Sequence, residues 1–565
     1  MKKIQNLLTF PFRFLHFLYL YFRVGIKNKS SFFIEVPSNF SVSRKSALLE
    51  FISGEKEVPL YIDFLKDLKI IRDSKIIDSV AILCDRIDFG FAELQEIGIL
   101  IKEIAESGKT VKGFAFTGDI KTLYLLSFIP KRYTIETGEF IFFLPAIESF
   151  FWGKLLKNWG VDVEAYTSGK YKSFAEPFQK EKFSPEAKEN LRNLIISLKE
   201  QILSGFNENT KLDWFKIQKP IMSSDYLKSI GFFHGFTDEV DFKKYHTLDD
   251  CIKIDDKSKE AISLNISILR KRNLYDNFKF FPEKKEYFAI IPLKGNINMG
   301  NRKESEMKEG SIHAYPVIDI LRSLEEREDV KAILLEIDSG GGSAFASELI
   351  YRELIKLGKK KKIYSYFQNI SASGGYYIGC GTELIGSSPF CITGSIGTVL
   401  VRPNLKGLYD KLHITKDRSE HYPGREMFSE YGKLTDFSKK FLTNEIERVK
   451  TQFYNVVCAS RKIERIDLEP KAGGRVFTGK EFLKQGMVDS NEGFLNFIYR
   501  IENDLKIKNP EWEYYVPIYN FKSMIRNFSF ASNFFKNPIS YIQMKADKYP
   551  LEYKCPYTEI LKNNL

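Results

Sequence analysis

The segment Asp329-Val-Lys-Ala-Ile-Leu-Leu-Glu-Ile337 is typical of a strand buried on both faces, because apolar residues dominate it. A helical segment follows over residues 344–357, and Gly358-Lys-Lys-Lys-Lys-Ile-Tyr-Ser-Tyr366 leads into a second strand. A strand, a helix and a strand at these spacings predict a βαβ unit. This half of the chain is expected to begin with the strand Tyr287-Phe-Ala-Ile-Ile-Pro-Leu293.

The first half of the chain shows the same succession of segments. Asp78-Ser-Val-Ala-Ile-Leu-Cys84 corresponds to the first strand, residues 91–107 to the helix, and Gly108-Lys-Thr-Val-Lys-Gly-Phe-Ala-Phe116 to the second strand. Similar strings also lie near the end of each copy, Tyr226-Leu-Lys-Ser-Ile-Gly231 and Phe482-Leu-Lys-Gln-Gly486. The sequence therefore predicts a repeated α/β design with mostly parallel sheets.

A chain of 565 residues is long enough for two or three domains with cores of their own. We expect an N-terminal domain over residues 46–275 and a C-terminal domain over residues 276–505, joined by the charged stretch 270–285. Residues 1–45 precede them, and residues 506–565 form an extension of unknown role. The extension is rich in aromatic residues. Two interpretations apply to them, packing on the body and contact with a membrane.

A candidate nucleophile lies in Ser371-Ala-Ser-Gly-Gly-Tyr-Tyr377, directly after the second strand of the second half. Glycines beside Ser373 let backbone N–H groups approach a reacting carbonyl. An ordinary tight turn is the alternative interpretation. The first half has Thr117-Gly-Asp-Ile-Lys-Thr-Leu-Tyr124 at this place, so only the second half carries the serine.

A serine needs a base, and the second half offers no well-placed one. His413 and His421 have no companion aspartate, which favours chance surface histidines. A neutral lysine can take the role if burial or nearby cations lower its pKa from about 10.4. Lys172 lies among aromatic and small residues in Ser168-Gly-Lys-Tyr-Lys-Ser-Phe-Ala-Glu-Pro-Phe178, a segment that on its own is more typical of an exposed loop.

Composition argues against several other classes of protein. The formal net charge is +12, but no nucleic-acid motif accompanies it, so solvated basic faces are expected and no nucleic-acid partner. The six cysteines form no C-x-x-C pair and the histidines do not cluster, so neither a zinc site nor another metal or cofactor is expected. The cysteines are Cys84, Cys251, Cys380, Cys391, Cys458 and Cys555.

Residues 4–22 form an aromatic, mostly apolar segment after Met1-Lys2-Lys3. Their length approaches the ~20 residues of a membrane span, but Pro11, Arg13 and His16 interrupt them. Dense aromatic residues flanked by Arg and Lys favour an interfacial helix or an uncleaved anchor. The alternative is a helix packed on the globular body.

Together these segments resemble signal peptide peptidase A in its long, tandem-domain form, over residues 49–498. The matching strings are Gly169-Lys-Tyr-Lys-Ser-Phe-Ala-Glu-Pro-Phe178, Phe183-Ser-Pro-Glu-Ala187, Ala372-Ser-Gly-Gly-Tyr376, Thr393-Gly-Ser-Ile-Gly397, Val476-Phe-Thr-Gly479 and Gly486-Met-Val-Asp489. The resemblance implies an α/β fold of tandem Clp-protease/crotonase-like αββ superhelical domains and a bowl-shaped homotetramer.

The resemblance also implies roles for individual residues. Ser373 is the expected nucleophile, Lys172 the general base, and Ser395 the residue that orients the lysine amine. Without the resemblance, Ser395 is more typical of a turn serine bonded to its own backbone. The expected oxyanion-hole donors are backbone N–H groups of glycines, with the candidates Gly341, Gly342 and Gly374.

One string departs from the family pattern. The family has Asn-Ser-Pro-Gly-Gly-Ser where this chain has Asp338-Ser-Gly-Gly-Gly-Ser343. A glycine in place of the proline loosens the loop. A carboxylate at Asp338 would be unfavourable if it faced a developing oxyanion.

The expected function is a membrane-associated serine endopeptidase that hydrolyses cleaved signal peptides and other hydrophobic or unfolded peptides. The resemblance implies attachment to the bacterial inner membrane with the catalytic body on the periplasmic side. Two alternatives remain open: a crotonase-like enzyme acting on acyl-coenzyme A, and a scaffold of the same fold with impaired catalysis.

Overall fold

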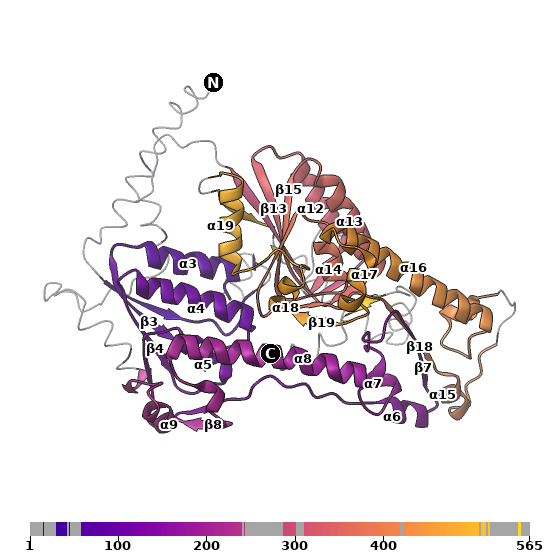
Figure 1. Ribbon diagram of the computed structural model, residues 1–565, viewed down its shortest axis with the longest axis horizontal. Coiled ribbons are helices and arrows are strands. Elements are labelled where there is room, and N and C mark those ends of the chain that lie inside the picture. Colours follow the sequence, from indigo (N-terminus) through magenta and orange to yellow (C-terminus); the bar gives the residue numbers. More distant parts are fainter. Residues whose placement is uncertain are drawn as a thin grey trace, which may run out of the picture. The chain divides into compact units, whose positions relative to one another are not determined.

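The computed structural model shows two compact units (Figure 1). It describes residues 30–41, 44–45, 58–239, 286–300, 310–417, 423–507, 510–515, 518–519 and 552–554, together with Leu15, Phe242 and Arg270. Unit 1 comprises Met1–Ser41, Lys56–Leu144 and Lys199–Lys285, and unit 2 comprises Val42–Glu55, Pro145–Leu198 and Glu286–Leu565. Helix α8 (Pro185–Thr210) carries the chain from unit 2 to unit 1.

Several sequence predictions fall outside the described residues. Apart from Leu15, the N-terminal segment 4–22 is one of them, and most of the charged stretch 270–285 is another. Within the described residues, no helix combines the length and hydropathy needed to cross a bilayer. His421, Cys251 and Cys555 also lie outside.

Unit 1 is built on a parallel five-stranded sheet. Its strands, in spatial order, are β1 (Ser30–Glu35), β3 (Ile77–Leu83), β4 (Thr110–Ala115), β5 (Lys131–Thr134) and β9 (Gly235–Phe236). Its helices are α3 (Tyr61–Asp73), α4 (Phe91–Glu106), α5 (Ile120–Ser127) and α9 (Ser224–Ser229), and β6 (Glu139–Ile141) pairs with β8 (Ile221–Ser223). The predicted strand, helix and strand of the first half correspond to β3, α4 and β4.

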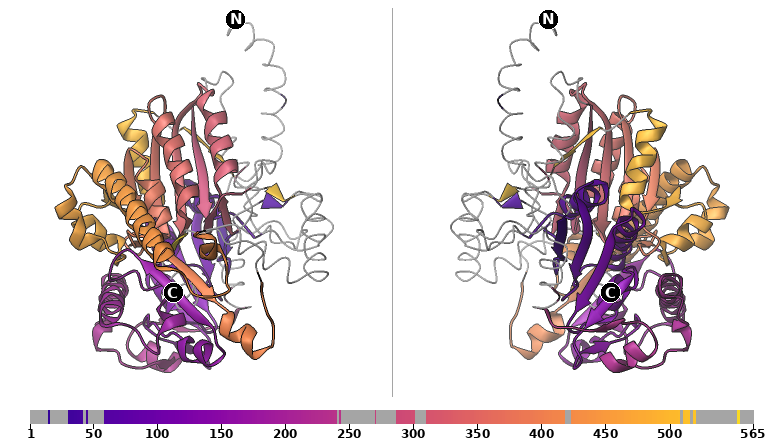
Figure 2. Two further views of the ribbon diagram at one scale, coloured as in Figure 1. Left: turned by 90° about the vertical axis from the view of Figure 1, so that its right-hand side faces the viewer. Right: turned by 90° about the vertical axis from the view of Figure 1, so that its left-hand side faces the viewer.

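Unit 2 contains a larger sheet in which every pairing except β17–β19 is parallel. The order is β19 (Val476–Thr478), β17 (Ile392–Gly394), β15 (Lys362–Ala372), β13 (Val330–Ser339), β10 (Tyr287–Lys294) and β21 (Glu511–Tyr514). Strand β16 (Leu384–Ser387) also pairs with β15, and β20 (Ser490–Asn491) pairs with β16. Figure 2 shows the long strands β13 and β15, in pink, running side by side. The predicted strands of the second half correspond to β10, β13 and β15, so the α/β expectation is confirmed.

Helices pack on the sheet of unit 2 through one continuous apolar core. They are α12 (Ala314–Glu325), α13 (Ala344–Leu357), α14 (Gly374–Gly379), α16 (Asp436–Arg461), α17 (Arg465–Leu468) and α18 (Gly479–Lys484). Helix α19 (Phe494–Asp504) lies against β15 through the contacts of Phe494 and Phe497 with Tyr366. Helix α13 has the predicted bounds, and the Ser343 hydroxyl caps it by accepting a hydrogen bond from the N–H of Ala346 at 3.3 Å.

A second sheet in unit 2 runs β12 (Ser311–His313), β11 (Asn296–Asn298), β14 (Gly341–Ser343), β23 (Glu552–Lys554), β18 (Val399–Asn404) and β7 (Asp162–Thr167). The short helices α6 (Gly153–Asn158), α7 (Glu176–Gln179) and α15 (Lys406–Lys411) flank the β7–β18 pair in sequence. Strand β7 comes from the first half of the chain and β18 from the second.

The β7–β18 pairing explains why the compact units differ from the expected domain ranges. The segment Pro145–Leu198 falls within the expected N-terminal domain 46–275, yet it belongs to unit 2. Part of the C-terminal extension also joins unit 2, because β21 adds to β10 in parallel and the Trp512 indole N–H donates to Glu502 at 3.3 Å. The aromatic residues Trp512 and Tyr515 therefore pack on the body.

Candidate active site

The candidate base and nucleophile meet inside unit 2. The Lys172 side chain is buried, and its Nζ lies 2.9 Å from Ser373 Oγ. The same nitrogen lies 2.9 Å from both the hydroxyl and the carbonyl oxygen of Ser395. These three atoms are uncharged oxygens, and Ser373 and Ser395 are themselves fully buried. The structure thus brings together the three side chains that the sequence singled out.

Ser373 lies at the junction between β15, which ends at Ala372, and α14, which begins at Gly374. Its φ of 55° is positive, a conformation that a non-glycine residue holds only when its surroundings enforce it. Here the Ser373 N–H donates to the Gly394 carbonyl at 2.8 Å, and the Ser373 carbonyl accepts from Tyr377 N–H at 2.9 Å. The strand-to-helix turn therefore fixes where the hydroxyl points.

The two glycines after Ser373 are required by packing. A Cβ on Gly374 would lie 2.6 Å from Ser347 Oγ, and one on Gly375 would lie 2.8 Å from the Ser339 carbonyl oxygen. Since real Cβ contacts are longer than this, neither position has room for a side chain. The glycines let α14 approach β13 and α13 closely behind the serine.

Ser395 also has a positive φ, 52°. Its N–H donates to the Arg475 carbonyl at 2.5 Å, and the strand before it is tied to β15 by the Thr393 hydroxyl, which donates to the Ser371 carbonyl at 2.7 Å. These hydrogen bonds join the segment to Arg475 on one side and to β15 on the other, and they therefore orient the Ser395 side chain. The hydroxyl contacts Lys172, so the turn-serine alternative does not describe its position.

The lysine segment reaches this site through the antiparallel β7–β18 pair. Thr167 pairs with Val399 at its end. Beyond that, Ser168 N–H donates to the Thr398 carbonyl at 3.0 Å, and its hydroxyl accepts from Thr398 N–H at 2.6 Å. This register carries Lys172, four residues further along the chain, to the segment that holds Ser395.

The three oxyanion candidates differ in what their backbone groups do. Gly341 N–H donates to the Ser339 hydroxyl at 3.1 Å, so it is already used within the loop. Gly342 bridges to Ile297 with a φ of 152°. Gly374 is the first residue of α14, and N–H groups in the first turn of a helix have no intrahelical acceptor. Gly374 is therefore better placed than Gly341.

Asp338, the departure from the family pattern, is held by a bulge in the neighbouring strand. The pairing of β13 and β15 shifts register between Ile337 and Ser339. At the shift, Asp338 Oδ1 accepts from Ile370 N–H at 3.1 Å, and Oδ2 lies 3.4 Å from Asn369 Nδ2. The carboxylate is thus hydrogen-bonded to the bulge.

The remaining polar candidates lie away from this chemistry. His413 is exposed at the end of α15. Burial raises the pKa of the Cys380 thiol to about 12 and that of Cys84 further, so neither is a thiolate near neutral pH. Among the described residues, no group of three or more His, Cys, Asp or Glu side chains could hold a metal ion.

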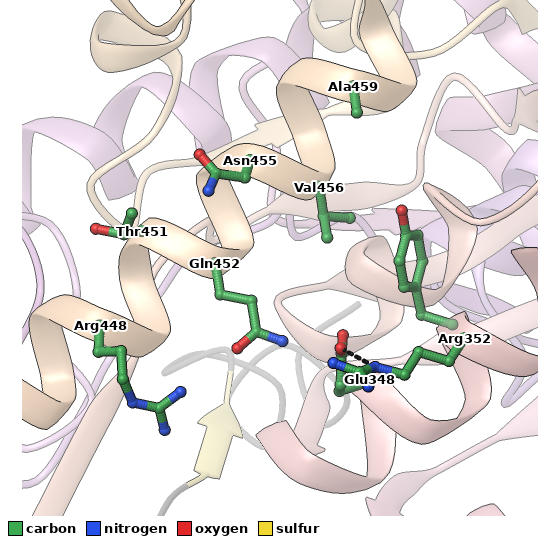
Figure 3. A pocket seen from close by; sticks show the side chains of 9 residues that line it. Glu348, Arg352, Arg448, Thr451, Gln452, Asn455, Val456 and Ala459 are labelled. Atoms are coloured by element: carbon green, nitrogen blue, oxygen red, sulfur yellow. Dashed lines mark hydrogen bonds and ion pairs between the residues drawn. The ribbon is translucent and has the colours of Figure 1, made fainter.

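A cavity of about 440 Å³ lies between α13 and α16 (Figure 3). Glu348 and Arg352 line it from α13, and Gln452 lines it from α16. The Tyr377 hydroxyl, on the helix that follows Ser373, donates to Glu348 Oε2 at 2.5 Å. The wall of the cavity therefore contacts α14 through this hydrogen bond, but neither Lys172 nor Ser373 lines the cavity.

Sequence reasoning missed the loop that precedes β19. Gly473, Gly474 and Arg475 make backbone hydrogen bonds to both the lysine segment and the Ser395 segment. A pair of adjacent glycines directly before the Val476-Phe-Thr-Gly479 string was the available signal. Asn190 was missed as well: its amide donates to the Val476 carbonyl and accepts from the Val476 N–H, both at 2.9 Å.

Comparison with known proteins places the chain among peptidases. The family model of peptidase family S49 matches residues 355–508. A protein of Synechocystis sp. that is named as a protease is 34% identical over 212 residues, which cover 38% of this chain and 71% of that protein.

Longer matches cover both halves of the chain. The chloroplastic serine protease SPPA of Arabidopsis thaliana is 25% identical over 421 residues, or 72% of this chain. Protease 4 of Haemophilus influenzae is 25% identical over 416 residues, covering 72% of this chain and 67% of that protein. The chain spans 60% of the length of the chloroplastic relative. The chain belongs to the signal peptide peptidase A proteins of peptidase family S49.

Proposed function

We propose that the chain is a serine endopeptidase in which Ser373 is the nucleophile and Lys172 the general base. The observation that carries this proposal is the distance of 2.9 Å between Lys172 Nζ and Ser373 Oγ, in a site where both side chains are buried. A base must lie within hydrogen-bond reach of the proton that it removes, and this pair meets that requirement.

The surroundings of the amine suit its neutral form. A neutral amine has two N–H donors and one lone pair. The Ser395 carbonyl can only accept, and the Ser395 hydroxyl can accept the second N–H, so the lone pair is left for the Ser373 hydroxyl proton. Burial acts in the same direction, because it penalises the charged form of a lysine.

The reaction then proceeds in two stages. Lys172 takes the Ser373 proton while Oγ attacks the peptide carbonyl, and the resulting oxyanion accepts hydrogen bonds from backbone N–H groups, with Gly374 and Gly342 as donors. Collapse of this intermediate breaks the C–N bond, and Lys172 gives its proton to the leaving amine. In the second stage Lys172 takes a proton from water, which attacks the acyl group, and Ser373 recovers its proton as it leaves.

The geometry of this site also bears on the two alternative functions. A crotonase-like acyl-coenzyme A enzyme is disfavoured because the chain belongs to a peptidase family and a lysine, with no acidic base, faces the serine. An impaired scaffold was suggested by Asp338, whose carboxylate is hydrogen-bonded to the strand bulge.

Turnover of an unstructured peptide substrate tests the proposal. We expect Ser373→Ala and Lys172→Ala each to reduce kcat by at least about 10³-fold, as for other members of nucleophile–base pairs. Both variants should melt at a temperature close to that of the wild-type protein. Near-normal turnover by either variant would refute the proposed dyad.

The wider functional assignment is also a proposal. Family membership supports cleaved signal peptides and other hydrophobic or unfolded peptides as substrates, a tandem Clp-protease/crotonase-like arrangement, and a homotetramer. The aromatic and basic character of residues 4–22 supports attachment to the bacterial inner membrane, with the body on the periplasmic side.

A further inference from the structure

A short loop joins the two segments that hold the lysine amine in place. It consists of Gly473, Gly474 and Arg475, between the 3₁₀ helix Glu469–Lys471 and β19, and is called the 473–475 loop below. Gly473 carbonyl accepts from Tyr171 N–H at 3.0 Å, Gly474 N–H donates to Ile396 carbonyl at 2.9 Å, and Arg475 carbonyl accepts from Ser395 N–H at 2.5 Å. One loop therefore bonds to the neighbour of Lys172, to Ser395, and to the residue after Ser395.

Gly474 lies directly against the backbone of Lys172. A Cβ on Gly474 would lie 2.4 Å from the Lys172 nitrogen, 2.6 Å from its Cα and 2.8 Å from its Cβ. These atoms cannot rotate away as the end of a flexible side chain can. Any side chain at position 474 must therefore displace the loop or the backbone of Lys172.

Arg475 adds a side-chain link to the same segment. Its guanidinium carbon lies 3.8 Å from the centroid of the Tyr171 ring, and Nη2 donates a hydrogen bond to the Tyr171 hydroxyl. A guanidinium stacked on an aromatic ring is attracted by the negative face of the ring. The arginine thus holds the residue before Lys172 through its side chain while its backbone holds Ser395.

We propose that the 473–475 loop is a positioning element that sets the distance between Lys172 Nζ and Ser373 Oγ. The inference rests on the proposed Ser/Lys function and adds residues to it that touch neither the substrate nor the reacting atoms. Because displacing a catalytic group by 1 Å can reduce the rate by about 10²-fold, a small shift of the lysine backbone has a large expected effect.

The chain offers a matched pair of variants, Gly474→Ala and Gly473→Ala. Both glycines have a positive φ, 90° and 68°. Each alanine therefore introduces backbone strain. Only position 474 is crowded, since the nearest atom to a Cβ on Gly473 is Gly169 Cα at 4.0 Å. Comparing the two variants therefore separates the effect of displacing Lys172 from the effect of backbone strain alone.

We expect Gly474→Ala to lower kcat for a peptide substrate by about 10²-fold with KM changed less than about threefold. Gly473→Ala should keep kcat within about threefold of wild type, with a smaller fall in melting temperature, because backbone strain acts there without crowding. The acid limb of the kcat/KM profile should move to higher pH in Gly474→Ala, because an amine displaced toward water is protonated more easily. A purely structural role would not move this limb.

Arg475→Ala provides a second variant in case Gly474→Ala does not fold. It keeps the backbone bonds of the loop and removes the contact with Tyr171, together with the 3.9 Å ion pair between the guanidinium and Glu189. We expect kcat to fall by about tenfold, which corresponds to 1.4 kcal/mol of transition-state stabilisation, with the same direction of shift in the pH profile. Unchanged kcat and an unchanged acid limb in Arg475→Ala would overturn the inference.

Lys172→Ala, measured in parallel, separates the two claims. If Lys172→Ala turns over peptide at the wild-type rate, the proposed function falls and the positioning role falls with it. If Lys172→Ala is inactive but Gly474→Ala and Gly473→Ala have equal kcat values and pH profiles, only the role of the 473–475 loop is overturned.

Discussion

Ser395 supplies two oxygen atoms that lie 2.9 Å from the Lys172 amine, one from its side chain and one from its backbone. Because one contact comes from the side chain and the other from the backbone, a mutation can remove the first and leave the second. Ser395→Ala removes the hydroxyl and leaves the carbonyl in place, so the amine keeps one acceptor and gains rotational freedom.

We therefore expect Ser395→Ala to lower kcat by about 10–10²-fold while leaving KM nearly unchanged, because only orientation of the base is affected. Ser371→Ala is a suitable control, since its buried hydroxyl donates to the Ile337 carbonyl at 2.8 Å. Steady-state kinetics of both variants provide the check. Equal kcat values for the two would show that the Ser395 hydroxyl does not orient the amine.

Asp338 gives a second prediction at the scale of a single residue. Asp338→Asn restores the family residue, and an amide oxygen can still accept the hydrogen bond from Ile370 N–H. Since the carboxylate is hydrogen-bonded to the strand bulge, we expect kcat to change by less than about threefold, or ~0.6 kcal/mol. An increase of tenfold or more in the kinetic assay would mean that the negative charge opposes the oxyanion.

At the scale of single residues, the sequence predicted much of the site. Ser373 was singled out by the glycines and aromatic residues beside it, whereas the role of Lys172 came from the resemblance to the signal peptide peptidase A family, and the structure places the two side chains together. The bonds of Gly474 and Arg475 could not be predicted, because contacts between distant backbones leave no periodic pattern in the sequence. The register shift at Asp338 was likewise invisible, since a bulge changes pairing without changing composition.

At the scale of elements, α16 begins with a buried carboxylate beside its N-cap. Glu426 Oε1 accepts from the Thr435 and Ser438 hydroxyls, both at 2.6 Å. These hydrogen bonds hold the pKa of Glu426 at about 2, well below its ordinary value. The folded pKa is depressed, so the stabilisation is complete above the unfolded pKa of about 4.3 and is lost as the pH falls toward 2.

Glu426→Gln should therefore lower the free energy of unfolding by about 1–3 kcal/mol at pH 7, the usual contribution of hydrogen bonds to a charged group. The difference from wild type should shrink as the pH falls below about 4. Thermal melting from pH 7 to pH 3 measures this, with the exposed Glu447→Gln as a control for loss of charge. A difference that stays constant with pH would contradict the assignment.

Element boundaries were predicted well where an apolar pattern set them. Helix α13 matches the expected range, β15 contains the expected strand, and β13 begins one residue after the expected strand and ends two residues beyond it. The pairing of β7 with β18 was not predicted, because each strand is short and only its partner shows where it belongs. That pairing is what takes Lys172 out of the expected N-terminal domain and into the unit that contains Ser373.

At the scale of the whole molecule, the N-terminal segment carries the prediction of membrane binding. Residues 4–22 combine aromatic residues with flanking Arg and Lys, a composition typical of the interface of an anionic bilayer. We expect the full chain to sediment with vesicles that contain anionic lipid, and a variant lacking residues 1–29 to remain in the supernatant. Equal sedimentation of both forms would show that another part of the chain binds the membrane.

The central claim is that Lys172 activates Ser373, and covalent labelling tests it most directly. A serine-reactive phosphonate is added to the full-length protein, and the modified residue and its rate of modification are determined by mass spectrometry. The account predicts modification at Ser373 in the wild-type chain and a rate at least about 10²-fold lower in Lys172→Ala. Modification of a different residue, or the same rate at Ser373 in Lys172→Ala, would contradict it.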